Sequence, residues 1–246
     1  MCPEHRRQAL EAVRRQLELG LPCRVVSTQL IEAGVDVDFP VVYRSLAGLD
    51  SIAQAAGRCN RNGRLARGRT LVFVSEHPTA EVFLRDTTNA ASQVLGLHPD
   101  PLSLEALEHY FKLYYWEQAS RWDQKHILQR FRLDNDPKLP FSFGFASVAR
   151  DFALIEDTGE PVIIPWGEQG QELCEALRRR PLADTVLLRR LQRYTVQVPR
   201  RHWREAMGRS IELVRDRFPV LLSPQLHYSD RFGLHLNDSL PAFLNA

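Results

Sequence analysis

Apolar and polar positions follow two different spacings along the chain. Residues 4–19 repeat their apolar positions at helical intervals, and Gly20 and Pro22 then end the pattern. Short runs rich in β-branched residues have the composition of buried strands, and they alternate with a helical stretch that opens with Asp50, a good N-cap residue. Such alternation predicts parallel strands in an α/β layer. The expected strands cover residues 24–28, 41–43 and 70–74, with the helix at 50–59 between the last two.

After residue 76 the pattern favours helices, followed by a mixture of short strands and helices. Ser103 stands where a helix N-cap is expected, and residues 157–160 separate two apolar runs in the manner of a β-hairpin. The predicted fold class is therefore α/β, with a partial parallel sheet followed by a mostly helical α+β C-terminal domain. The other expected elements are helices at 79–95, 103–119, 123–131, 171–179 and 182–193, and strands at 194–198 and 219–222.

The composition is that of a globular protein with a substantial core, because 44% of the 246 residues are hydrophobic and 25% are charged. No apolar run approaches the ~18 residues that a membrane span needs, and the first residues do not resemble a secretory signal. The four cysteines form no CxxC pair, which argues against a zinc site. We therefore expect free thiols, a cytoplasmic location, no membrane contact and no metal site within this sequence.

Arginine dominates the positive charge and is clustered. The net charge is only +2, yet 29 of the 32 basic residues are arginine, because lysine occurs only three times. A GC-rich genome would explain the overall excess, but not the dense groups at residues 58–69 and 178–204. Patches of this kind suit polyanions even in a nearly neutral protein.

Two arginines three residues apart, Arg58 and Arg61, follow Gly57 at the expected end of a helix. Guanidinium groups are planar and permanently charged, so the pair presents a double fork for phosphate. In phosphoryl transfer, an arginine that reaches the γ-phosphate neutralises charge that develops in the transition state. The alternative is a solvated basic turn. Gln54 just before the pair, and the Gly-Val-Asp stretch that begins at Gly34, favour the phosphate site.

Three upstream residues are candidates for contact with nucleic acid or nucleotide. Thr28 ends an expected strand, where α/β proteins bind ligands, and its hydroxyl suits a nucleic-acid phosphate. Gly34 allows a close backbone approach or a positive φ. Asp36 can accept hydrogen bonds from a ribose or hold an arginine. The alternative is an ordinary connection between a strand and a turn.

Taken together, residues 25–64 resemble motifs V and VI of a superfamily 2 helicase. Within them, residues 27–39, with the sequence STQLIEAGVDVDF, are similar to one branch, the CRISPR-associated helicase-nuclease of type I interference systems. Ala55 and Ala33 stand where other superfamily 2 proteins often carry arginine, which weakens an RNA-helicase interpretation. Stretches similar to the accessory C-terminal domain of the CRISPR family occur at residues 143–152, 191–196 and 228–234.

The resemblance implies a role for each candidate residue. The arginine pair would be catalytic and, with Gln54, would face ATP across the cleft between two helicase lobes. Gly34 and Asp36 would take part in nucleotide binding and couple it to DNA. Thr28 would contact the DNA backbone. The implied domains are a partial second RecA-like helicase lobe with motifs V and VI at residues 1–76, a helical connector at 77–140 and an accessory C-terminal domain at 141–246.

The implied function is that of the C-terminal part of an ATP-dependent single-stranded DNA helicase in type I CRISPR interference. The sequence lacks the GxxxxGK[ST] phosphate loop, an Asp-Glu dipeptide and a His-Asp dipeptide. We therefore expect that ATP and Mg²⁺ are bound mainly by residues missing from this chain, and that the chain alone is inactive. The implied partners are single-stranded DNA, an N-terminal helicase/nuclease half and the crRNA-guided surveillance complex.

Two other interpretations are compatible with the sequence. The chain is then either a non-catalytic fragment that binds DNA or the surveillance complex, or part of another superfamily 2 translocase. The first alternative predicts binding without ATP hydrolysis. The second predicts a C-terminal region that packs unlike the accessory domain of the CRISPR family.

Overall fold

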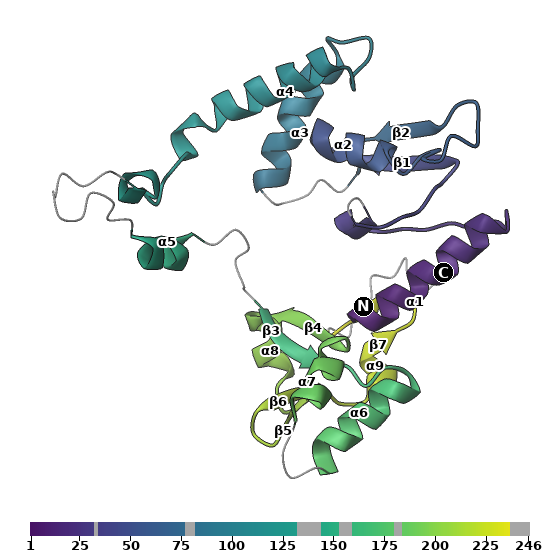
Figure 1. The fold of residues 1–246 in the computed structure, drawn as a ribbon, viewed down its shortest axis with the longest axis vertical. Coiled ribbons are helices and arrows are strands. Elements are labelled where there is room, and N and C mark those ends of the chain that lie inside the picture. The colour runs from purple at the N-terminus through teal and green to yellow at the C-terminus, as the bar shows by residue number, and fades with distance from the viewer. Residues whose placement is uncertain (32–33, 77–81, 132–143, 153–158, 180–183, 237–246) are drawn as a thin grey trace. The chain divides into compact units, whose positions relative to one another are not determined.

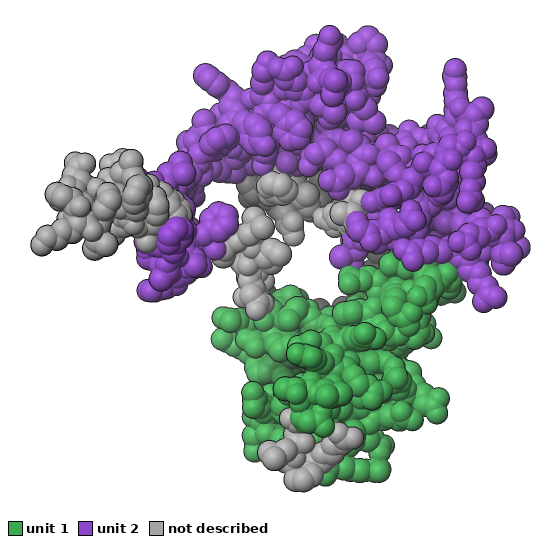
Figure 2. Space-filling view, in the orientation of Figure 1, with its two compact units in different colours: residues 1–12, 155–246 green, residues 13–154 purple. Residues whose placement is uncertain are grey.

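The computed structural model describes residues 1–246 except for 32–33, 77–81, 132–143, 153–158, 180–183 and 237–246 (Figure 1). The chain forms two compact units, which Figure 2 shows in different colours. Unit 1 combines residues 1–12 with residues 155–246, and unit 2 consists of residues 13–154. The domain boundaries that the resemblance implies, at residues 76 and 140, are not tested by this division into units and stay predictions.

The first half of the chain contains the predicted α/β layer. Its elements are α1 (Pro3–Glu18), a 3₁₀ turn η1 (Gln29–Ile31), β1 (Val41–Ser45), α2 (Leu49–Ala56), β2 (Arg69–Phe73), α3 (Val82–Leu95), α4 (Leu104–Glu117), 3₁₀ turns η2 (Ala119–Arg121) and η3 (Leu128–Phe131), and α5 (Phe145–Asp151). β1 and β2 pair in parallel, in a register that runs from Val41 opposite Arg69 to Ser45 opposite Phe73. Parallel pairing across a helix is what the sequence pattern predicted.

Two predicted elements of unit 2 are wrong. Residues 24–28 form no strand, and Val26 is fully exposed. A strand needs a neighbour for its backbone hydrogen bonds, and β1 and β2 pair only with each other in the described sheet. The helix expected at 123–131 is reduced to η3, because Asp123 has a φ of 51° and its carboxylate accepts the backbone N–H of Ile127 at 2.5 Å. That local hydrogen bond competes with helix formation.

Unit 2 has a small core where α2, α3 and α4 meet. Ser103 caps α4 as predicted, since its Oγ accepts the backbone N–H of Ala106 at 3.2 Å. Tyr110 on α4 is 1% exposed, and its hydroxyl donates to Asp50 in the first turn of α2 at 3.0 Å. The buried residues of this core are Leu49, Ile52, Ala90, Ala91, Val94, Ala106 and Tyr110.

Unit 1 is built on a four-stranded mixed sheet. Its elements are β3 (Gly159–Ile163), α6 (Gly167–Arg179), α7 (Thr185–Gln192), β4 (Thr195–Pro199), α8 (Arg200–Ala206), β5 (Ile211–Val214), β6 (Phe218–Leu221), α9 (Pro224–His227), β7 (Tyr228–Ser229) and β8 (Gly233–Leu234). The strand order is β4-β3-β6-β5, with β3 and β6 parallel and the other neighbours antiparallel. The first arm of the predicted hairpin lies outside the described residues, and its second arm, β3, pairs with β4 and β6.

The start of α1 is part of the core of unit 1. Cys2 is fully buried, and its backbone N–H donates to the hydroxyl of Tyr228 at 2.9 Å. The ring of His5 stacks on Trp166 with 4.1 Å between centroids, and its Nδ1 lies 2.9 Å from the same Tyr228 hydroxyl. This helix was predicted from its apolar spacing, but its buried residues are Glu4 and His5. Among the helices that the structure describes, none is both long and apolar enough to cross a membrane.

Candidate functional site

The segments that carry the predicted motifs V and VI are held together by backbone hydrogen bonds. The N–H of Phe39 donates to the carbonyl of Arg58 at 2.9 Å, and the N–H of Asn60 donates to the carbonyl of Phe39 at 2.8 Å. These two bonds form a short parallel bridge between Phe39 and Cys59. We call residues 34–40 and 57–62 the motif clasp. The clasp fixes the arginine pair against the loop that begins at Gly34.

Asp38 closes the motif clasp with its carboxylate. Its two oxygens accept the backbone N–H groups of Arg61 and Asn62 at 2.7 and 3.2 Å. Asn60 has a φ of 49°, and its side-chain amide both donates to and accepts from the backbone of Leu65 at 2.8 and 2.9 Å. No role for Asp38 was predicted from the sequence. The feature of the sequence that could have pointed to Asp38 is its place as a second carboxylate two residues after Asp36, with the buried Val37 between them.

Arg61 and Asp36, both predicted site residues, form an ion pair. The Nε of Arg61 lies 3.3 Å from Oδ1 of Asp36, and the side chains are 42% and 78% exposed. The backbone carbonyl of Asp36 also accepts a hydrogen bond from Nε of Arg14 on α1 at 2.8 Å. Exposed ion pairs contribute about 0–1 kcal/mol. A phosphate can therefore compete with Asp36 for Arg61 at little cost.

The side chain of Arg58 is oriented by a backbone carbonyl group that lies outside the motif clasp. Its Nε donates to the carbonyl oxygen of Ile31 in η1 at 3.1 Å, and the side chain is half-buried. Partial burial in a region of low dielectric strengthens the attraction of a guanidinium for an anion. Among the predicted residues, Arg61 and Asp36 meet in an ion pair, and Arg58 is held to the clasp by the bond from the N–H of Phe39 to its carbonyl.

The other predicted residues lie close in sequence to this group: Gly34 precedes Asp36 by two positions, Gln54 precedes Arg58 by four, and Thr28 precedes Ile31 by three. Gly34 has a φ of +70° and open space where a Cβ would lie, as expected for a position that requires glycine's freedom. Gln54 is exposed in the last turn of α2. Thr28 is exposed immediately before η1, rather than at the end of a strand. The donors at the clasp, guanidinium groups and backbone N–H groups, suit phosphate oxygens.

The residues that match a known protein family include the whole motif clasp. Residues 2–64 match the family described as CRISPR-associated nuclease/helicase Cas3, C-terminal. Residues 2–64 are therefore similar to that family. The resemblance predicted from the sequence is thus confirmed, and we call residues 2–64 the Cas3-like segment. A CRISPR-associated nuclease/helicase Cas3 of Haloferax volcanii is 42% identical over 81 residues, which are 32% of this chain and 9% of that protein.

Solved structures extend the similarity to most of the fold. The crystal structure of T. fusca Cas3 superposes with a TM-score of 0.55 at 15% identity, and that of T. fusca Cas3-ATP with a TM-score of 0.53 at 13% identity. Each match covers 89% of this chain and 31% of the T. fusca chain. The chain therefore spans about a third of the length of these Cas3 structures. At this identity the similarity establishes the fold alone, and it confirms the predicted α/β class.

Proposed function

We propose that the motif clasp supplies the arginine side of the ATP site in a single-stranded DNA helicase of type I CRISPR interference. The observation that carries this proposal is the clasp itself: within the Cas3-like segment, two arginines are held next to the Gly34–Asp38 loop by hydrogen bonds. The phosphate cradle and most of the contacts to ATP and Mg²⁺ are assigned to residues outside these 246, because the sequence contains no GxxxxGK[ST].

In this proposal the two arginines exchange protein acceptors for the γ-phosphate. Arg58 leaves the carbonyl of Ile31 and Arg61 leaves the carboxylate of Asp36, and both donate to phosphate oxygens as negative charge develops. A bond from Arg58 to phosphate is stronger than its bond to the neutral carbonyl of Ile31, because both partners are then charged, whereas Arg61 exchanges one anionic acceptor for another. Asp36, once released, is available to the nucleotide's ribose.

The motif clasp also offers a path from nucleotide to DNA. Arg58 contacts Ile31, three residues after Thr28, whose exposed hydroxyl would hold a phosphate of single-stranded DNA. Departure of Arg58 toward ATP therefore releases the segment that contacts the strand. Single-stranded DNA, an N-terminal helicase/nuclease half and the crRNA-guided surveillance complex are the proposed partners, in the cytoplasm.

Measurement of ATP hydrolysis tests this function. The assay uses this chain mixed with a Cas3 helicase/nuclease half, or the same substitutions in the intact enzyme, with single-stranded DNA present. Arg58→Ala and Arg61→Ala should each lower the rate by about 10³-fold, as expected for loss of an arginine finger. Arg64→Ala, which removes an exposed arginine from the same loop, is the matched control. Rates within about twofold of the unsubstituted enzyme for both variants would remove the arginine assignment.

A further inference from the structure

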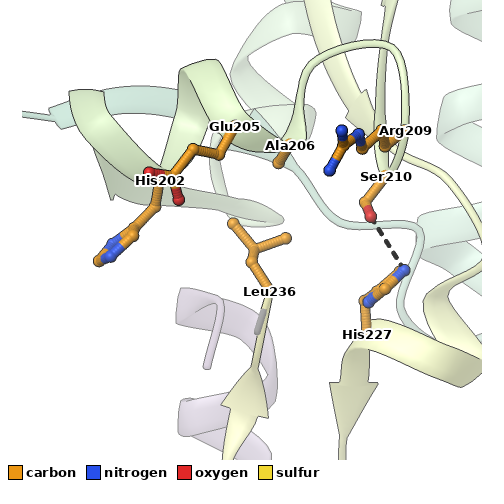
Figure 3. Close-up of a pocket in the computed structure, with 7 residues that line it drawn as sticks. All are labelled: His202, Glu205, Ala206, Arg209, Ser210, His227 and Leu236. Carbon is orange, nitrogen blue, oxygen red and sulfur yellow. Dashed lines mark hydrogen bonds between the residues drawn. The ribbon is translucent and has the colours of Figure 1, made fainter. Parts of the chain in front are cut away.

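Unit 1 contains a cavity that the helicase proposal does not use. Its volume is about 300 Å³, at the lower limit for small-molecule sites (Figure 3). α8, the turn after it, α9 and the last described residue supply the walls. The residues that matter for its chemistry are His202, Glu205, Arg209, Ser210, His227 and Leu236.

A serine and a histidine face each other in this cavity. Oγ of Ser210 lies 3.0 Å from Nε2 of His227 (Figure 3). Such a pair suggests a nucleophile with its base, but an oxyanion would also need backbone donors. The N–H groups of Arg209 and Ser210 both donate to the carbonyl of Ala206, at 3.1 and 2.8 Å. Because these donors are occupied, the geometry favours binding over acyl transfer.

The charge around the cavity is positive. Glu205 is the acidic residue of the wall, and Arg201 already pairs with it, with Nε 3.3 Å from Oε1. Arg200 likewise pairs with Glu160. Arg209 is exposed and has no ion-pair partner among the described residues. In Figure 3 its guanidinium lies near Ala206 and Ser210, on the same side as the Ser210–His227 pair. A single uncompensated guanidinium beside a hydroxyl and an imidazole is a set of donors for an oxyanion.

We propose that this cavity binds a phosphate group, either of a nucleotide or of a nucleic-acid strand. Arg209 donates two hydrogen bonds to the phosphate oxygens, and the hydroxyl of Ser210 donates a third. For Ser210 to donate outward, its oxygen accepts the Nε2–H of His227, so the bound anion selects that histidine tautomer. Leu236 lies between His202 and His227 and provides an apolar contact for the rest of the ligand (Figure 3).

Binding of inorganic phosphate to the full chain tests the site without any ATP hydrolysis. ¹⁵N-histidine labelling reports the ring nitrogens of His227, and His227→Gln identifies their signal. Phosphate should shift this signal saturably, whereas sodium chloride of equal ionic strength should not. Arg209→Ala should weaken phosphate binding about tenfold or more, the effect of losing a charge-assisted hydrogen bond, and Ser210→Ala should weaken it by less. Arg189→Ala, which removes an exposed arginine of α7, should leave the affinity unchanged.

Competition with bound phosphate distinguishes a nucleic-acid strand from a free nucleotide as the natural ligand. Displacement of phosphate by a short oligothymidylate assigns the site to a strand, and displacement only by a thymidine monophosphate assigns it to a free nucleotide. Unshifted His227 nitrogens at tens of millimolar phosphate, where even a weak specific site would fill, would overturn the proposal. Equal phosphate affinity in Arg209→Ala and the unsubstituted chain would also overturn it. Neither result bears on Arg58 and Arg61, so this site and the helicase assignment fail separately.

Discussion

The motif clasp and the core of unit 1 are stabilised by different interactions. The clasp depends on hydrogen bonds between named polar groups, such as the Asp38 carboxylate and two backbone N–H groups. The core of unit 1 consists of buried apolar side chains from its helices and strands. A polar bond needs one residue type at one position, whereas a core accepts many apolar residues of suitable size. The family match covers residues 2–64, which include the clasp, while the structural similarity covers 89% of the chain at 13–15% identity.

The sheets of the two units also differ in how many of their strand residues are buried. In unit 1, β3, β5 and β6 each bury two residues, and Ile211 and Val220 are fully buried. In unit 2, β1 and β2 bury none, and Tyr43 and Phe73 are 70% and 48% exposed. Substitutions at the buried positions of the sheet in unit 1 should therefore lower stability more than substitutions on the exposed strands β1 and β2.

The largest expected effect on stability is in the core of unit 1. Ile211→Ala leaves a cavity beneath β5 and should lower the free energy of unfolding of unit 1 by about 2–5 kcal/mol. Tyr43→Ser on exposed β1 should change stability by less than about 0.5 kcal/mol. Chemical denaturation with hydrogen exchange resolved to each unit measures both. Equal losses for the two variants would show that the contrast between the sheets is wrong.

A smaller effect is expected when the clasp loses its carboxylate. Asp38→Ala removes the acceptor for the N–H groups of Arg61 and Asn62, and the local opening free energy should fall by about 1–2 kcal/mol, since bonds to charged groups are among the stronger ones. Asp38→Asn keeps one acceptor oxygen and should lose less. Amide hydrogen exchange at residues 60–62 measures the change. Unaltered exchange in Asp38→Ala would mean that the carboxylate does not hold the clasp closed.

The smallest effect is a pH dependence of unit 1. Burial lowers the pKa of His5 from its ordinary 6.5, although the Asp230 carboxylate acts in the opposite direction. Between the lowered pKa and 6.5 the unfolded chain binds more protons than the folded one, so the free energy of unfolding rises with pH in that window. Stability should therefore fall as the solution is acidified below 6.5.

Thermal unfolding from about pH 5 to 7.5 measures this dependence. His5→Gln should flatten the slope, because the titrating ring is gone. The exposed His126 is the matched control, and His126→Gln should leave the slope as it is. An identical slope in the unsubstituted chain and His5→Gln would show that His5 does not contribute.

The sequence predicted most of the helices and strands that depend on interactions between residues close together in the chain. The Ser103 cap, the spacing of α1 and the parallel pair β1–β2 all follow from short stretches of chain. The strand at residues 24–28 was predicted wrongly. A run of β-branched residues indicates a preference for extended backbone, but it does not show that a neighbouring strand is available for pairing. β5 and α8 were not predicted, since neither the four residues of β5 nor the seven residues of α8 show a clear apolar period.

The candidate site was predictable where residue type determines chemistry. Gly34 and the arginine pair were proposed as site residues from their spacing, and the Arg61 ion pair matches one of the two roles, ribose acceptor or arginine partner, that the sequence allowed for Asp36. Asp38 was missed because its partners are backbone groups more than twenty positions away. The Ser210–His227 pair was missed for the same reason, since the two residues are 17 positions apart and meet only through the fold.

The most direct test of the central claim is a structure of the intact enzyme with ADP, aluminium fluoride and single-stranded DNA, which mimics the transition state of hydrolysis. We expect the guanidinium nitrogens of Arg58 and Arg61 to lie about 3 Å from the fluoride or phosphate groups, with their bonds to Ile31 and Asp36 broken. Both arginines still bonded to Ile31 and Asp36 beside an occupied nucleotide site would contradict it.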